Sequence, residues 1–239
     1  MTVVLLPETA IRWRTATWRL GRADAVQEFM SGATQVTAFS KAIWSGQIEL
    51  PSLNDDAGAL RKWRSALARL SALGNTFEAI APGAESGPST GYAGSTPVVN
   101  GAGQLGLSIV VSGASPNAAL VNAGDYLSVI AGGWRELKIV TSDVVTDGTG
   151  AATIAFEPAL RNAPNDSARV DIFTPKGAFR LADASAAWRL SPNGIGNIVF
   201  DVEEAFAPGA GSVTEDPQLA TFDSGDIQLD STQVTWDAA

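Results

Sequence analysis

Residues 126–140 read YLSVIAGGWRELKIV, two β-prone runs on either side of Gly132-Gly133. Paired glycines favour a tight turn, so this stretch predicts two strands joined by a turn. Similar runs occur before and after it, separated by turn-forming residues such as Asp147-Gly148. The complete set is 107–112, 126–131, 134–140, 151–156 and 168–173. Five short strands of this kind predict a small five-stranded β-barrel.

The segment that forms this barrel lies between two parts of the chain that we expect to belong together. Residues 82–106 are rich in Gly, Ser, Pro and Ala, which is typical of a surface loop leading to a domain boundary. After Pro175 come two strand-like runs, around Phe179 and around Phe200, which are too short to make a core alone. We therefore predict a β assembly domain of residues 1–100 together with 177–206, an inserted barrel domain of residues 101–176, and an acidic C-terminal arm of residues 207–239.

The assembly domain is expected to contain strands and one helix. Residues 11–20 and 34–51 are rich in aromatic and β-branched side chains and predict strands. Apolar residues then recur every three or four positions, which predicts an amphipathic helix over residues 55–73, with Asn54 able to cap its first turn. The apolar stripe consists of Leu60, Trp63, Leu67, Leu70 and Leu73. The expected fold is therefore mainly β, with antiparallel strands, one helix, an inserted barrel and an extended arm.

The chain contains no Cys and no His. Their absence removes disulfides, thiolate nucleophiles, imidazole bases and nearly every zinc, iron or copper site. We therefore expect no enzymatic activity, no catalytic residues, no cofactor and no metal. No apolar run approaches the roughly 20 residues needed to cross a bilayer, so membrane insertion is not expected either.

The formal net charge of −9 is concentrated in the arm. Residues 207–239 hold six acidic residues and no Lys or Arg, which leaves 19 acidic and 16 basic residues in the rest of the chain. Direct binding of nucleic acid is not expected, because it needs a basic field. The arm and the basic side of the predicted helix could instead meet between copies, although such a helix face can also be merely solvated. The candidate subunit contacts are Arg61, Arg64, Ile227, Leu229, Val234 and Trp236.

Three further motifs are weaker than they look. Residues 101–106 match G-x-G-x-x-G, but a strand is predicted after them where a dinucleotide site needs a helix. Residues 143–150 lack the ligand spacing of a calcium loop and predict a hairpin turn. Glu203-Glu204 must point to opposite faces of a strand, so we interpret them as an exposed strand end and not as an acid/base pair.

Several short motifs occur in order along residues 10–206. They are WSGQ at 44–47, the helix of 61–73 followed by NTF at 75–77, the glycine-rich segment 101–106, AGDY at 123–126, DGTGA at 147–151 and PALR at 158–161. This order resembles minor tail proteins of long-tailed, siphovirus-like bacteriophages, especially the distal tail protein. The resemblance implies a ring-forming β domain with a barrel, stacked between the tail tube and a trimeric tail-tip hub, with no catalytic residues. The arm has no counterpart in it.

The resulting hypothesis is a structural, homo-oligomeric ring protein of the virion, located at the baseplate or tail tip and made in the host bacterial cytoplasm. Its partners would be further copies of itself, the tail tube protein and the hub protein. The alternative is a carbohydrate-binding adhesion module that recognises a host-surface glycan through Tyr126 and Trp134, although a buried position in the barrel is the simpler expectation for Trp134. A tail-associated hydrolase is a third possibility, with few residues left to perform it.

Overall fold

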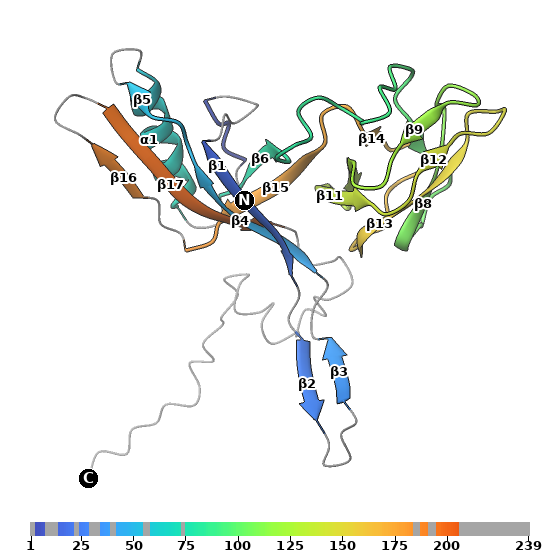
Figure 1. Ribbon diagram of the computed structural model, residues 1–239, viewed down its shortest axis with the longest axis horizontal. Helices are drawn as coiled ribbons and strands as arrows, with labels where there is room; N and C mark the ends of the chain where they lie inside the picture. The colour runs from blue at the N-terminus through green and yellow to red at the C-terminus, as the bar shows by residue number, and fades with distance from the viewer. Residues whose placement is uncertain are drawn as a thin grey trace, which may run out of the picture. The chain divides into compact units, whose positions relative to one another are not determined.

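The computed structural model describes residues 3–7, 14–21, 24–28, 34–38, 42–54, 58–72, 75–183, 187–190 and 195–205. Within this part of the chain the protein is mainly β, with antiparallel strand pairs and one helix, as the sequence predicts (Figure 1). Residues Met1–Phe206 form one compact unit. The predicted arm and its candidate contacts Ile227, Leu229, Val234 and Trp236 lie outside the described residues.

The first sheet joins strands from both ends of this unit. Its seven strands include the path β1 (Thr15–Gly21), β4 (Ile43–Glu49), β17 (Ile195–Glu204), β15 (Lys176–Leu181) and β6 (Phe77–Ile80). Two short strands, β5 (Leu53–Asn54) and β16 (Ala187–Leu190), pair with β17 as well. The alternating residues Ile198, Phe200 and Val202 of β17 are all buried, so the late strand-like runs do return to the sheet of the N-terminal residues.

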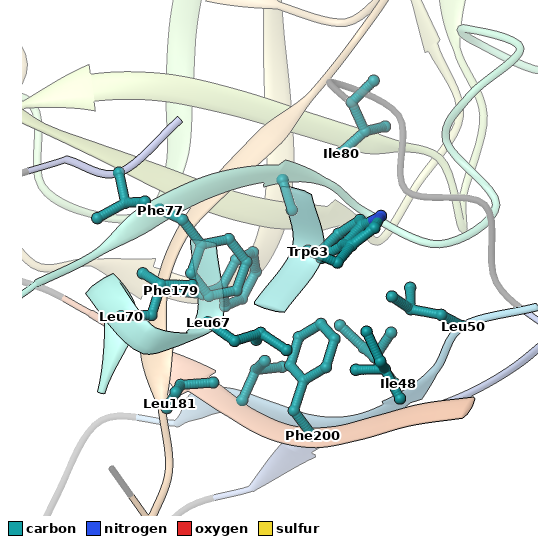
Figure 2. Packing of buried hydrophobic residues seen from close by; sticks show 14 of the residues in the cluster. Ile48, Leu50, Trp63, Leu67, Leu70, Phe77, Ile80, Phe179, Leu181 and Phe200 are labelled. Carbon is teal, nitrogen blue, oxygen red and sulfur yellow. The ribbon is translucent and has the colours of Figure 1, made fainter. Parts of the chain in front are cut away.

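Helix α1 (Ala59–Leu70) covers the core of the first sheet. Four residues of its predicted stripe are confirmed, because Leu60, Trp63, Leu67 and Leu70 are all buried there, and Figure 2 shows Trp63 and Leu67 packed near Phe200. The helix ends at Leu70, and the fifth predicted residue, Leu73, lies outside the described residues. Trp63 and Phe200 have ring centroids 6.2 Å apart.

The predicted start of the helix is wrong. The residue before Ala59 is Gly58, whose φ of 68° is left-handed, and no side chain caps the helix. Asn54 cannot serve as the cap because it belongs to β5, where it pairs with Ile195 of β17. Pairing with a sheet strand has therefore overridden the local preference of Asn for a cap.

The second sheet is a nearly closed, six-stranded barrel-like sheet. Its order is β14 (Val170–Asp171), β10 (Tyr126–Ala131), β11 (Trp134–Val140), β13 (Ala152–Leu160), β8 (Gly106–Ser112) and β7 (Val98–Val99). The first and last strands approach each other, because the Val99 amide donates to the Ala168 carbonyl at 2.8 Å and the Ser167 amide to the Val99 carbonyl at 2.9 Å. The strand absent from the five-run prediction is β7, which has only two residues.

The β10–β11 turn is the one that the opening stretch predicts. Ala131 pairs with Trp134, and the two residues between them, Gly132 and Gly133, have φ angles of 58° and 81°. Both values are left-handed, which is why glycine suits a two-residue hairpin turn of this kind.

A further small pair of strands, β9 (Ala119–Val121) with β12 (Val144–Val145), packs on the core of the second sheet.

The chain passes from the first sheet to the second after β6 and returns to the first sheet at β15, and these two strands are neighbours. Ile80 at the end of β6 pairs with Lys176 at the start of β15, and the Ala81 amide donates to the Pro175 carbonyl at 3.2 Å. All strands from β7 to β14 lie between these two points of the chain.

The open backbone edges among the described residues include those of β1 and of the β2–β3 hairpin. Strand β1 ends the first sheet and pairs there with β4 alone. The hairpin of β2 (Asp24–Glu28) and β3 (Thr34–Ala38) forms a separate two-stranded sheet. An isolated hairpin of two strands is at best marginally stable in water, so this one needs further contacts.

Candidate functional site

The most deeply buried charged groups of the described residues form an ion pair in the second sheet. Lys138 Nζ lies 2.8 Å from Glu136 Oε2, and the two side chains are 0% and 2% exposed. Both residues belong to β11 and stand two positions apart, so they share one face of the strand. Their cross-strand partners are Leu127 and Val129, two residues of the barrel core.

Backbone groups complete this pair. Glu136 also accepts hydrogen bonds from the amides of Arg161 and Asn162, each at 3.1 Å, and Lys138 donates to the Ala159 carbonyl at 3.2 Å. A buried charge must be paired and hydrogen-bonded to be tolerated, and this one is. Burial nevertheless lowers the pKa of Lys138, with Glu136 opposing that shift.

A second ion pair joins the end of the barrel to the first sheet. Arg161 Nη2 lies 3.2 Å from Glu204 Oε2 of β17 and donates to the Ala42 carbonyl at 2.7 Å. The same Glu204 oxygen accepts the Trp44 amide at 3.1 Å. Burial raises the pKa of Glu204, although the nearby Arg161 acts in the opposite direction.

Glu204 is therefore not part of an exposed strand end, and that interpretation of Glu203-Glu204 is wrong. Glu204 is 3% exposed, whereas Glu203 is partly exposed and pairs with Arg180. The two carboxylates do point to opposite faces of β17. Glu204 is on the face that contacts Arg161 of the second sheet, and it is buried there.

Apolar and aromatic contacts surround the two ion pairs. The Trp44 indole N–H donates to the Leu137 carbonyl at 3.0 Å, and Leu137 is part of the first sheet's core although it belongs to β11. Gly177 on β15 permits this approach, because a Cβ there would lie 3.3 Å from the Leu137 Cβ and 2.5 Å from the ring of Phe179. Strand β11 is thus covered on both faces.

This junction links the two sheets through the Arg161–Glu204 ion pair and the hydrogen bond from Arg161 to the Ala42 carbonyl. A catalytic Lys needs access to a reacting atom, and the Lys138 side chain has no exposed surface. We name the set Glu136, Lys138, Arg161 and Glu204 the junction tetrad. Sequence reasoning missed it, although Glu136 and Lys138 stand two positions apart in a predicted strand and therefore share one of its faces.

The two candidate glycan residues are not brought together. Tyr126 pairs with Ile139 and Trp134 with Ala131, so they stand at opposite ends of the β10–β11 hairpin. Ala131 is five positions after Tyr126 in the strand, which corresponds to roughly 16 Å. Tyr126 is half-buried against Trp44, with ring centroids 5.8 Å apart, and this burial raises the pKa of its hydroxyl.

Trp134 is half-buried at the rim of a small recess. The recess has a volume of about 130 Å³ and includes Glu78 and Arg135, which form an ion pair at 3.3 Å. Val3, Thr76, Phe77, Gly133 and Ala178 complete its lining.

The candidate cations of α1 lie on its solvent side. Arg61 is exposed and Arg64 is partly exposed. Arg61 borders a groove of about 410 Å³ between α1 and the N-terminal segment, together with Leu5, Pro7, Lys62, Ser65, Ala66 and Arg69. Arg64 does not line it.

The weaker motifs have structural roles. Residues 101–106 lead into β8, so a strand does follow them as expected. The Asp147 carboxylate accepts hydrogen bonds from the Thr149 hydroxyl at 2.7 Å and from the amides of Thr149 and Ala151 at 2.8 and 2.9 Å. These bonds close a turn, and the hydroxyl bond and then the amide bonds lower the pKa of Asp147. Among the described residues, no group of acidic side chains is arranged to hold a metal ion.

The part of the chain that the structure describes contains no helix long and apolar enough to cross a membrane. A scan against models of known protein families and a search of curated proteins both find no match for this chain.

Proposed function

We propose that this chain is a structural component of a phage tail tip, similar to distal tail proteins, and that it assembles into a ring between the tail tube and the tail-tip hub. The observation that carries the proposal is the pair of open backbone edges. Strand β1 has one paired side within the described residues, and the β2–β3 hairpin pairs only with itself. Closed rings remove such edges by pairing or covering them with a neighbouring copy.

The side chains of β1 support the same proposal. Ala16, Trp18 and Leu20 alternate along the strand and remain partly exposed, although Trp18 stacks on Trp44 at 6.2 Å. A neighbour laid along β1 would bury this remaining apolar surface, at about 25 cal/mol for each Å² removed from water. The junction tetrad suits an assembly role too, because it links the second sheet to the first through buried polar contacts.

The test is the size of the full chain in solution and in images. We expect sedimentation velocity to show one discrete oligomer whose fraction increases with protein concentration, and electron microscopy to show rings. Ala16→Glu places a charge on the partly exposed side of β1 and should shift the protein toward monomer. Thr153→Glu adds the same charge at an exposed position of β13 and should not. A chain that stays monomeric at every concentration would contradict the proposal.

A carbohydrate-binding module is the second candidate, and the recess beside Trp134 favours it. An aromatic ring next to a carboxylate and a guanidinium offers both a stacking surface and hydrogen-bonding groups for a sugar. If this candidate is correct, the protein binds cell-surface polysaccharide in a calorimetric titration, Trp134→Ala abolishes the binding, and Tyr126→Phe leaves it unchanged. A monomer that binds polysaccharide would favour this function over the ring.

A further inference from the structure

The groove beside α1 combines apolar and basic surface. One wall is the N-terminal segment with Leu5 and Pro7, and the other is the solvent side of α1 with Arg61, Lys62 and Arg69. Arg61 and Lys62 are adjacent, and Arg69 follows them by eight and seven positions, which is about two turns and places the three cations on one side of the helix.

The apolar wall is held in place. The Val4 amide donates to the Thr76 carbonyl at 2.7 Å, Val3 forms a parallel bridge with Thr76, and the Val4 side chain is 1% exposed. The next residue, Leu5, is 85% exposed. Leu5 and Pro7 therefore give the basic groove an apolar wall, and this combination is complementary to an acidic segment with apolar side chains.

The chain itself contains a segment of that chemistry. Residues 207–239 carry six carboxylates and no basic residue, and their apolar residues include Ile227, Leu229, Val234 and Trp236. The groove volume of about 410 Å³ is large enough for an indole side chain and an aliphatic neighbour.

We propose that this groove binds the C-terminal segment 207–239 of a second copy of the chain, with Trp236 beside Leu5 and the carboxylates near Lys62 and Arg69. The inference rests on the proposed ring function, because in a ring each copy can donate one segment and receive one. It revises the expected set of contacts, since Lys62 and Arg69 line the groove and Arg64 does not. The charges would mainly guide association, and the apolar contacts would supply most of the binding free energy.

Single cysteines can test this in the full chain, because the natural sequence has none. Ser65→Cys places a thiol in the groove, and Ala238→Cys places one two residues after Trp236, close to it along the chain. The two variants are mixed, oxidised and separated on a non-reducing gel. Ser142→Cys, an exposed position in the loop after β11, replaces Ser65→Cys as the control. We expect a heterodimer with Ser65→Cys and none above background with Ser142→Cys.

Charge and side-chain variants test the chemistry of the contact. Lys62→Glu in the Ser65→Cys protein should reduce the heterodimer yield by roughly three-fold or more, whereas Arg169→Glu makes the same charge change at an exposed position elsewhere and should have little effect. Trp236→Ala in the Ala238→Cys protein should reduce the yield further than Lys62→Glu does. The yield should also fall as salt is added, because exposed charge pairs are screened.

Other results would overturn the inference. Equal cross-linking of the Ser65→Cys and Ser142→Cys proteins would indicate random collision. If the Ser65→Cys and Ala238→Cys double variant forms only an internal disulfide and the mixture forms no heterodimer, the segment binds its own chain. If the protein forms rings but no cross-link, the proposed groove contact is wrong and the proposed ring function stands. If the protein neither cross-links nor oligomerises, both the groove contact and the ring function are wrong.

Discussion

Removing the ammonium group of Lys138 should destabilise the protein by about 3 kcal/mol. Breaking a buried ion pair by deleting one partner costs about 3–5 kcal/mol, because the other charge is left without compensation. In Lys138→Met the remaining Glu136 carboxylate, 2% exposed, still accepts the Arg161 and Asn162 amides, which favours the lower end of that range. For a chain of this size the loss corresponds to a fall in Tm of about 6–12 °C.

The matched double variant distinguishes the ion pair from simple loss of packing. Glu136→Gln alone leaves Lys138 with only the Ala159 carbonyl from its present partners, so it should cost about 3 kcal/mol or more. The double variant Glu136→Gln, Lys138→Met has no buried charge there, and we expect it to lose only about 1 kcal/mol.

Urea unfolding followed by tryptophan fluorescence measures all of these variants. Arg169→Met, at an exposed position away from the ion pair and from the groove beside α1, is the control and should change stability by no more than about 0.5 kcal/mol. If the double variant loses the sum of the two single losses, or if Lys138→Met is as stable as the natural chain, the account of the ion pair is wrong.

Burial raises the pKa of Glu204, so the stability that its protonated form contributes is present at low pH and is lost as the pH rises from 4.5 through the pKa of the folded state. The Tm of Glu204→Gln should therefore increase relative to the Tm of the natural chain as the pH rises through this range. A decrease of the Tm difference would refute this account. Gly46→Ala should cost about 1–3 kcal/mol in thermal unfolding, because its Cβ would lie 2.4 Å from the Thr17 carbonyl oxygen, whereas Gly148→Ala meets nothing and should be neutral. A fragment of residues 88–176 should fold and give dispersed amide chemical shifts. A fragment of residues 104–176 should be less stable, because it lacks β7, and a more stable 104–176 fragment would contradict the account of barrel closure. Chelators should leave the Tm of the full chain unchanged, and purified protein should not hydrolyse peptidoglycan; either effect would oppose a purely structural role.

Local sequence patterns were sufficient for most elements of the fold. The turn at Gly132-Gly133 and the stripe from Leu60 to Leu70 depend on residues close together in the chain, and both were predicted correctly. The short strand β7 was missed, because its two residues are stabilised by pairing with β8 and with residues near Ala168, far along the chain. Asn54 was misassigned for the same reason.

The junction tetrad illustrates the same limit for a site. Arg161 meets Glu204 and Ala42 across long stretches of sequence, and no local pattern identifies such partners. The Glu136–Lys138 pair was accessible in principle, since both residues fall within one predicted strand. The roles of Arg61 and Arg64 could not be separated from the sequence, because the groove is formed partly by Leu5 and Pro7 of the N-terminal segment.

The pairing of Ile80 with Lys176 has a consequence for engineering. Strands β6 and β15 form an antiparallel pair whose ends lie opposite each other, so we expect the segment that connects them to be replaceable, as the loop of a hairpin is. A two-residue turn in place of residues 81–175 would preserve this pairing, and the entropy of loop closure changes only slowly with the length of the connection. The limit to such exchange is the apolar surface around Trp44, which any substituted module must cover in place of Leu137.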